Sequence, residues 1–501
     1  MKDFHQVEKD RIKYHALPNK NTVHRSSLIV PDILNSEAWI GFINHFLIKR
    51  GYKSVALKIS AINKIGYLLD TLTIEINEPK VYSFNLTKMF SKFNSANYLI
   101  EFFSEKNLFI PFPAVIISHF GKDFCNVVHT YNRILNDVFE NDQINKTQVS
   151  EASFDLDINN KYDTFFNLST GMSDVNNSSL FLSYEKNKKK IEKKIKISLP
   201  RLSYKSFYLS KIFSKELHGN GKEFNGGVVR IKQPKQNLFF GRLLAGIINK
   251  KTKAFSANHT YYDSTKIAKY FSLPNSFRTY PFFKNFVNKI TMYPIFSPSK
   301  LTIYLKIYNK KGTFISQKFK FLSTSSFPLS INVNDFVESE NLQDVTAFTL
   351  VADGSEGRIP TRVNHQLIYG ELTDKNSLKC SINASLSNKS IFQPKKKKGF
   401  IWGQFINHKD YNSKIGFCFS SPEGKSDLIK IDFYNSKGRF KSKKKILNPK
   451  ESLIFSANEI LDSSKKLELN WYVAKCIRHD LAAYSVHTHQ LSGNSSGEHY
   501  F

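Results

Sequence analysis

The sequence repeats itself four times, and this repeat limits the possible folds more than any other feature of the chain. An alternating apolar segment runs three times into an Asn-x-x-Gly turn, and once into a similar turn with Lys190 in place of the glycine. The turn asparagines, separated by 124, 122 and 126 residues, are Asn63, Asn187, Asn309 and Asn435. Regular self-similarity of this kind predicts that the 501 residues form four copies of one structural unit.

Two further sets of anchors keep a similar period. After each turn comes a strand candidate followed by a short apolar hook, and the hooks end at Phe90, Phe213, Phe336 and Leu461. Ahead of each turn lies a phenylalanine anchor, and these anchors are Phe42, Phe166, Phe283 and Phe405. Because three separate features share one period, the four units are expected to have the same internal order of elements.

Alternation of apolar and polar residues predicts that each unit is built from strands. It is clear at Val55, Leu57 and Ile59, and no segment has comparable helical periodicity. About seven short strands in about 100 residues is typical of an antiparallel sandwich, and on strand count and spacing the units resemble immunoglobulin-like domains. We therefore predict an all-β chain of four tandem antiparallel β-sandwich (immunoglobulin-like) repeats of about 100–125 residues with short linkers, each burying its own core.

Changes in composition suggest the domain boundaries. A polar, acidic stretch follows the first unit, and a stretch with one proline and a run of lysines precedes the last. The predicted parts are an N-terminal extension (1–35), repeat 1 (36–135), a linker (136–161), repeat 2 (162–270), repeat 3 (271–380), a basic linker (381–399) and repeat 4 (400–501).

The formal net charge of +31 raises the question of an anionic partner. A second interpretation is that lysine is enriched by nucleotide bias, because the over-used residues Lys, Asn, Ile, Phe and Tyr share adenine- and thymine-rich codons. Arginine, which base-reading sites prefer, is scarce, so specific nucleic-acid recognition is not expected. An anionic partner stays open beside a glycan or a protein.

No segment reaches the roughly 18 consecutive apolar residues of a membrane span, and the first residues lack the apolar core of a signal peptide. We therefore expect a cytoplasmic protein, with export that uses no cleaved signal remaining open. The four cysteines form no C-x-x-C pair. Three of them lie in apolar, strand-like surroundings, which favours burial for Cys125, Cys418 and Cys476.

A histidine lies near the end of each unit, and an aromatic residue follows it in the first three. The residues are His129 with Tyr131, His259 with Tyr261, His365 with Tyr369, and His487. One interpretation is structural, with a strand-end imidazole that bonds a neighbouring carbonyl or carboxylate while the tyrosine packs across a corner. The other is a ligand-binding residue repeated in each domain. The structural interpretation is favoured, because four separate domains would have to bring their histidines together.

The C-terminal segment carries a denser cluster of possible metal ligands. His487 and His489 are two apart on a strand candidate, so their rings are expected on one side, and Glu498 or His499 could supply a third ligand. The H-x-H pair resembles that of a cupin, although the glutamate follows at a longer distance here. The cluster therefore predicts a candidate site for a divalent metal.

No constellation of residues typical of catalysis appears elsewhere. The leading hypothesis is a non-enzymatic multidomain β-sandwich interaction or structural protein, without a cofactor, that binds a glycan, a cell-surface component or a protein. The alternative is a metal-dependent enzyme with its site at the C-terminal H-x-H…E-H cluster. A third hypothesis, electrostatic binding of nucleic acid, predicts an affinity that falls steeply with salt.

Overall fold

The structure is a computed structural model of the chain. It describes residues 24–104, 114–129, 133–134, 151–186, 189–217, 224–234, 238–240, 242–260, 271–272, 275–292, 301–323, 329–339, 342–354, 359–360, 362–374, 376–387 and 399–500. Nearly all regular structure in these ranges is β, and they contain no helix long and apolar enough to cross a membrane. The predicted all-β class is confirmed.

The chain divides into two compact units. Repeats 1 and 2 form the first unit, which comprises Met1–Lys122, Val127–Glu185 and Lys189–Tyr262. Repeats 3 and 4 form the second unit, which comprises Asp123–Asn126, Lys186–Lys188 and Asp263–Phe501.

Each repeat in the first unit contributes eight recurring strands. Repeat 1 contains β1 (His24–Pro31), β2 (Glu37–Ile43), α2 (His45–Arg50), β3 (Ala56–Ile62), β4 (Leu68–Glu75), β5 (Val81–Asn85), α3 (Leu86–Met89), β6 (Asn97–Ser104), β7 (Ile116–Phe120), β8 (Cys125–His129) and β9 (Arg133–Ile134). Repeat 2 contains β10 (Glu151–Ile158), β11 (Tyr162–Ser169), β12 (Val175–Lys186), β13 (Lys189–Leu199), β14 (Tyr204–Tyr208), α5 (Leu209–Ile212), α6 (Ser214–Leu217), β15 (Phe224–Lys232), β16 (Leu238–Phe240), β17 (Leu244–Asn249) and β18 (Phe255–His259). The short β9 and β16 extend a sheet of repeat 1.

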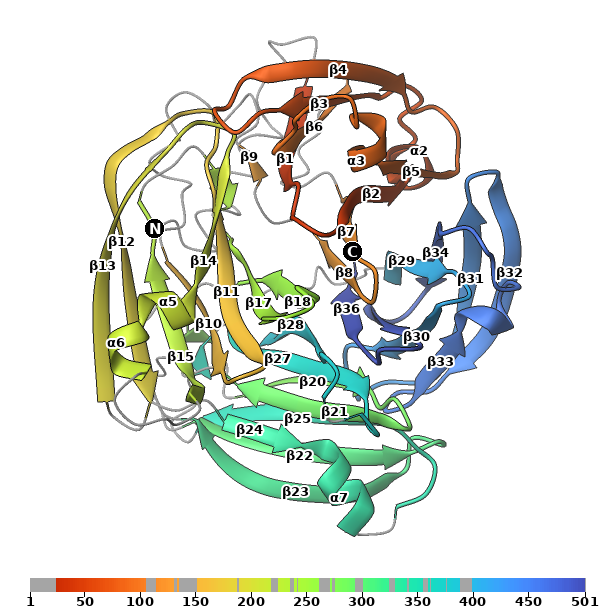
Figure 1. Cartoon of the computed structure of the whole chain (residues 1–501). Coiled ribbons are helices and arrows are strands. Elements are labelled where there is room, and N and C mark those ends of the chain that lie inside the picture. The colour runs from red at the N-terminus through yellow and green to blue at the C-terminus, as the bar shows by residue number, and fades with distance from the viewer. Residues whose placement is uncertain are drawn as a thin grey trace. The chain divides into compact units, whose positions relative to one another are not determined.

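The second unit repeats the pattern twice, with repeat 3 in green to teal and repeat 4 in blue in Figure 1. Repeat 3 contains β19 (Phe271–Ser272), β20 (Asn275–Pro281), β21 (Phe286–Met292), β22 (Leu301–Asn309), β23 (Phe314–Ser323), β24 (Leu329–Asn332), α7 (Val333–Ser339), β25 (Val345–Gly354), β26 (Ile359–Pro360), β27 (Arg362–Glu371) and β28 (Cys380–Ser387). Repeat 4 contains β29 (Gly399–Asn407), β30 (Tyr411–Phe419), β31 (Asp427–Asn435), β32 (Gly438–Leu447), β33 (Ser452–Ser456), η2 (Ala457–Glu459), β34 (Glu468–Cys476), β35 (Leu481–His489) and β36 (Ser495–His499).

All four repeats have one topology. When the eight recurring strands of each repeat are lettered a to h in chain order, one sheet has the order a-f-c-d and the other has the order e-b-g-h. In repeat 3 the two sheets join through a single pair, Phe277 with Ser387, and count as one eight-stranded sheet. Immunoglobulin constant domains instead have strands ABED on one sheet and CFG on the other. Four tandem antiparallel sandwiches are therefore confirmed, and their likeness to immunoglobulin domains lies in the architecture of two packed sheets.

The regular spacing of the turn asparagines comes from the hairpin between strands c and d, where the asparagines of repeats 1, 3 and 4 lie. Asn63 Oδ1 accepts the N–H groups of Ile65 and Tyr67, both at 3.0 Å. Asn309 Oδ1 does the same for Lys311 and Thr313, at 3.0 and 2.9 Å. The side chain thus adds to the backbone hydrogen bonds that close the turn, such as those from the Gly66 and Gly312 N–H groups to the Asn63 and Asn309 carbonyls. The turn at Asn187 includes residues outside the described ranges.

The predicted hooks are short helices that follow strand e. Asn85 caps α3 by accepting the Lys88 N–H at 3.0 Å, and Ser456 forms a capping box with Glu459 at η2. In repeats 2 and 3 the same place is taken by α5 and α7. Each helix returns the chain from one sheet to the other, which explains why an apolar residue ends the hook.

Strand a of repeats 1 and 2 lies in segments that the sequence assigned elsewhere. His24–Pro31 falls within the predicted N-terminal extension, yet it pairs with β6 along its whole length. Glu151–Ile158 falls within the predicted linker and pairs with β15. Both segments mix polar and apolar residues beside strongly polar runs, which weakened the alternation signal.

The two units differ in how much core their repeats share. In the first unit a small buried cluster joins Ile29, Ile62 and Leu99 of repeat 1 to Leu202 of repeat 2. In repeat 2, Phe154 and Phe166 from the two facing sheets belong to one buried cluster, with ring centroids 5.9 Å apart. In the second unit one cluster spans both repeats, because Tyr484 of repeat 4 packs against Tyr280 of repeat 3 at 5.7 Å. The Cys418 thiol also donates to the Thr279 carbonyl at 3.2 Å. The prediction that each repeat buries its own separate core is wrong for repeats 3 and 4.

Candidate functional site

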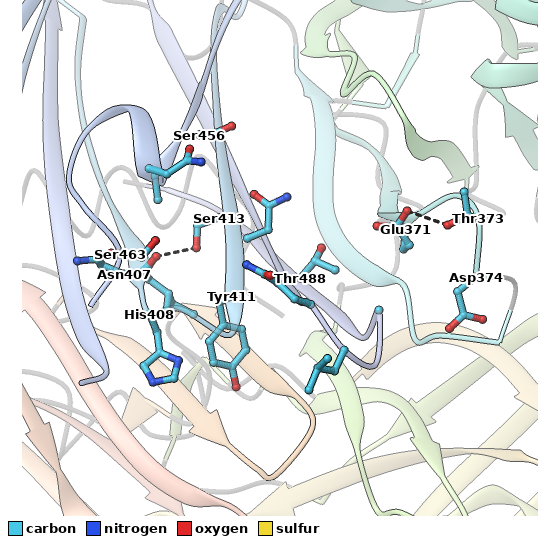
Figure 2. Close-up of a pocket in the computed structure, with 17 residues that line it drawn as sticks. Glu371, Thr373, Asp374, Asn407, His408, Tyr411, Ser413, Ser456, Ser463 and Thr488 are labelled. Atoms are coloured by element: carbon cyan, nitrogen blue, oxygen red, sulfur yellow. Dashed lines mark hydrogen bonds between the residues drawn. The ribbon is translucent and has the colours of Figure 1, made fainter. Parts of the chain in front are cut away.

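A groove of about 540 Å³ lies between repeats 3 and 4 within the second unit. Figure 2 shows one wall from the turn after β27 and the other from the edge of repeat 4. Its lining residues are Glu371, Thr373, Asp374, Ile406, Asn407, His408, Tyr411, Asn412, Ser413, Ser456, Ala457, Asn458, Ser463, Thr488, Gln490, Leu491 and Gly493. The groove is assembled from four segments that are distant in sequence.

The repeat 3 wall carries the two carboxylates of the groove. Glu371 ends β27, and its Oε1 accepts the Thr373 hydroxyl at 3.1 Å. Asp374 Oδ1 accepts the Asn376 N–H at 2.7 Å in the following turn. Lys379 stabilises this turn, because its ammonium group donates hydrogen bonds to the backbone carbonyls of Glu371 and Asp374.

The repeat 4 wall presents two aromatic rings and several amides. His408 Nε2 lies 3.2 Å from the Lys465 carbonyl, and the Asp410 N–H points to Nδ1 at 3.2 Å. These partners place the proton on Nε2. Tyr411 lies beside this ring, with centroids 5.9 Å apart, and Asn407 Nδ2 donates to the Asp462 carbonyl at 3.1 Å.

His487 and His489 lie beneath the repeat 4 wall and contact residues that line it. His487 Nδ1 is 2.9 Å from Ser413 Oγ. The His489 ring meets Tyr411 edge to face, with centroids 5.4 Å apart at 73°. The H-x-H pair therefore supports the groove from inside the sandwich, and both rings are on one side of β35 as the sequence predicted.

The electrostatics of the groove contrast with those of the whole chain. Among the described residues that line it there is no lysine or arginine, although the chain carries 73 of them. Burial lowers the pKa of His487 to about 3, so this imidazole is neutral at pH 7. Burial also raises the pKa of the Tyr411 phenol, which keeps it protonated. The groove thus offers neutral hydrogen-bonding groups and two carboxylates.

The four candidate metal ligands at the C-terminus do not converge. Thr488 pairs with Ser495 and Ser485 pairs with Glu498, so Glu498 lies four residues along β35 from His489. His499 pairs with Tyr484, one residue farther. At about 3.4 Å per residue, these positions are roughly 14 and 17 Å from His489. His489 Nδ1 instead lies 3.1 Å from Ser492 Oγ, and His499 Nδ1 lies 3.1 Å from Glu498 Oε1. This geometry does not form the predicted four-ligand cluster.

The four repeated histidines occupy different positions in the repeat. His129 and His259 end strand h of repeats 1 and 2. His365 and His487 lie in strand g, where His365 pairs with Met292 and His487 pairs with Ser413. Their spacing in the sequence did not reveal this, because neighbouring strands g and h both contain histidine.

In the first unit, His129 and His259 come together. Their ring centroids are 4.7 Å apart and the rings are nearly perpendicular, at 88°. Arg242 Nη1 lies 3.3 Å from His259 Nε2. The aromatic residues predicted to accompany them, Tyr131 and Tyr261, lie outside the described residues.

One position of strand g recurs with a shared contact, and its first member was not among the candidate residues predicted from the sequence. From the residue before each short helix, the e–b and b–g pairs lead to Ser118, Ile368 and Val486. The next residue of strand g is the recurring position, and it holds His119, Tyr369 and His487. His119 Nε2 lies 2.9 Å from the Pro31 carbonyl, and the Tyr369 hydroxyl donates to the Pro281 carbonyl at 2.9 Å. Both prolines end strand a, so the contact ties the two sheets together.

In repeat 4 the same tie is indirect. His487 Nε2 lies 3.2 Å from Ser485 Oγ, which in turn lies 3.2 Å from the Gln404 carbonyl of β29. His365 ties the sheets of repeat 3 at another level, because its Nε2 is 2.6 Å from the Tyr280 hydroxyl of β20. In the sequence, His119 ends an apolar segment that begins at Ala114 and is typical of a strand, and this place at the end of the segment is the one signal that could have identified it.

The four cysteines are buried free thiols. Burial raises the pKa of Cys380 and Cys418 to about 12 and that of Cys476 to about 11. The predicted burial of Cys125, Cys418 and Cys476 is confirmed, and thiols of this kind act as small apolar side chains.

Comparison with known proteins gives little further information. No protein-family model and no curated protein matches the chain. Among solved structures, a β-glucuronidase of Bacteroides uniformis is similar over 46% of this chain and 26% of its own, at 10% identity and a TM-score of 0.13. A tetra-tandem repeat from the extending region of a large adhesion protein is similar over 94% of this chain and 97% of its own, at 8% identity and a TM-score of 0.09. The chain thus spans about a quarter of the glucuronidase, and superpositions with such TM-scores carry no argument about fold or function.

Proposed function

We propose that this protein is a non-enzymatic binding protein and that the groove between repeats 3 and 4 holds a neutral glycan. The observation that carries the proposal is the chemistry of the groove. Its amide and hydroxyl side chains match the hydrogen-bonding groups of sugars, and the Tyr411 ring offers an apolar face against which a sugar ring can pack. Its volume of about 540 Å³ lies in the range of small-ligand sites.

The charge of the groove favours a neutral glycan over an anionic one. The two charged side chains among its lining residues are the carboxylates of Glu371 and Asp374. A sulfate or uronate group placed beside them would be repelled by the two carboxylates, and none of the described lining residues is a lysine or arginine. The basic character of the chain as a whole therefore does not describe this site.

The position of the carboxylates favours binding over hydrolysis. Glycoside hydrolysis usually needs two carboxyl groups that flank the scissile bond. Here Glu371 and Asp374 come from the same wall, and Figure 2 shows the opposite wall with amide, hydroxyl and aromatic side chains. A glycan in this groove would have carboxylates on one side alone.

Replacing Tyr411 by alanine is expected to weaken glycan binding about tenfold or more, because the sugar loses its aromatic contact. The measurement is calorimetric titration of the full chain with neutral oligosaccharides chosen by an array screen. Asn412→Ala, which removes an exposed amide of the groove, is expected to weaken binding less.

The matched control is Tyr67→Ala, which removes a tyrosine that is 58% exposed in repeat 1. Affinity equal to wild type is expected for this variant. The proposal fails if no neutral oligosaccharide binds the wild-type chain, or if Tyr411→Ala and Asn412→Ala both bind as tightly as the control.

A further inference from the structure

The outer face of the a-f-c-d sheet of repeat 4 carries a row of lysines on adjacent strands. Lys430 of β31 pairs directly with Lys475 of β34 on one side and with Lys444 of β32 on the other. Directly opposite residues of an antiparallel pair project to the same face, so the three ammonium groups share it. Lys444 and Lys475 are exposed, and the Lys430 side chain is 43% exposed.

A row of exposed aliphatic side chains runs beside the lysines. Leu428 pairs with Ile446, and Ile477 directly follows β34 at the matching place. These side chains are 50%, 66% and 70% exposed, respectively. Two residues along a strand separate the two rows, a distance of about 7 Å. We call the six side chains together the lysine–aliphatic face.

This arrangement opposes folding stability. Like charges directly opposite in a sheet repel each other, and three exposed aliphatic side chains in one row lie in water. Two contacts partly offset the repulsion between the lysines. The Asp432 carboxylate is 3.4 Å from the Lys430 ammonium, and the centroid of the Phe400 ring is 4.9 Å from the Lys475 ammonium. A partner that brings both negative charge and an apolar layer would satisfy the two rows at once.

We propose that the lysine–aliphatic face binds the surface of a bilayer that contains anionic phospholipids. The lysines would contact the phosphate layer while Leu428, Ile446 and Ile477 enter the boundary between headgroups and acyl chains, as the apolar residues of interfacial proteins do. A polysaccharide or nucleic acid would use the lysines and leave the aliphatic row in water. The face is separate from the groove, so this proposal does not depend on the proposed function.

The experiment is co-sedimentation of the full chain with vesicles of phosphatidylcholine, with and without about a third phosphatidylserine. The wild-type chain is expected to sediment with the anionic vesicles and to be released by salt. The triple variant Lys430→Gln, Lys444→Gln and Lys475→Gln is expected to lose about a hundredfold in partition coefficient. The triple variant Leu428→Ser, Ile446→Ser and Ile477→Ser is expected to lose at least about tenfold.

The matched control is Lys409→Gln, Lys437→Gln and Lys466→Gln, which removes the same charge from exposed lysines outside the face. It is expected to bind within about twofold of wild type. Equal losses in both lysine variants would show that net charge alone acts and would overturn the proposal. An unchanged partition coefficient in the serine variant would also overturn it, because the contact would then be of the kind that a polyanion makes. The proposal would fail as well if the wild-type chain did not sediment with anionic vesicles. Thermal melting of each variant identifies a loss that comes from unfolding, and the single variant Lys444→Gln on the edge strand β32 then repeats the test.

Discussion

Acidification to about pH 4.5 is expected to unfold the protein, because four histidines are buried as neutral rings. Burial lowers the pKa of His45, His365 and His487 to about 3 and that of His119 to about 4. Below the ordinary pKa of about 6.5 the unfolded chain takes up protons that the folded chain does not, so stability falls with pH. The loss begins below about pH 6.5 and is complete near pH 3.

The size of this effect is large compared with ordinary stability. At about pH 4.5 each of these histidines lowers the free energy of unfolding by about 2 to 3 kcal/mol. His45 and His119 belong to the first unit, and His365 and His487 belong to the second. Each unit therefore loses about 5 kcal/mol, which equals the whole stability of many domains.

The measurement is chemical denaturation at several pH values between about 7.5 and 4.5, the range in which these groups act. The variant His487→Gln is expected to be less stable at neutral pH and to lose less on acidification, because it takes up one proton fewer on unfolding. The control is Tyr369→Phe, at the equivalent position of repeat 3, where no group titrates in this range. It is expected to lower stability by about 1 kcal/mol at every pH. A free energy of unfolding that stays constant from about pH 7.5 to about pH 4.5 would contradict the assignment of these buried histidines as neutral.

Local chemistry made the fold class and the repeat predictable. The Asn63 and Asn309 turns depend on side-chain and backbone groups within a few residues. The same residue types therefore occur at the turn in each repeat that forms this hairpin. The hooks of repeats 1 and 4 also follow from neighbouring residues, since Asn85 caps α3 and Ser456 forms a capping box at η2. Such features keep their spacing in sequence because their geometry is local.

Equivalence across strands was not predictable from spacing. The phenylalanine anchors show this, because Phe42 lies in strand b while Phe405 lies in strand a. The histidines divide in the same way between strands g and h. Register decides which residues are equivalent, and a shift of one residue moves a side chain to the other face of the sheet. His119 matches His487 by register, and its spacing in the sequence does not show this match.

The groove was invisible in the sequence for a related reason. Its walls come from the turn at Asp374, the start of β30, η2 and the turn after β35, which are brought together by the packing of repeat 4 on repeat 3. The sequence singled out His487 and His489, which do contact the groove, but it gave them the role of metal ligands. Only the pairing of β35 with β30 shows that they face Ser413 and Tyr411.

The shared core of repeats 3 and 4 leads to the second large expected effect, which is at Gly497. A Cβ atom at this position would lie 2.8 Å from Cys380 Sγ, 2.8 Å from the Ser485 carbonyl and 3.0 Å from Ile382 Cδ1. The carbonyl belongs to β35, which pairs with β36 at this level, so it cannot withdraw without loss of sheet hydrogen bonds. Gly497→Ala is expected to lower the free energy of unfolding by about 2 to 3 kcal/mol, and Gly497→Val by more.

Chemical denaturation measures the loss in the free energy of unfolding. The rate at which a thiol reagent modifies Cys380 measures whether the disturbance at Gly497 extends into repeat 3. Both are expected to change in Gly497→Ala, because the added methyl group pushes against the Cys380 sulfur across the boundary between the repeats. The control is Gly226→Ala, where the new Cβ meets nothing within 4 Å and only a φ of +71° opposes the change. That variant is expected to lose about 1 kcal/mol and to leave Cys380 protected. If Gly497→Ala matched this control in both measurements, the two repeats would not be packed as one core, and the groove between them would lose its structural basis.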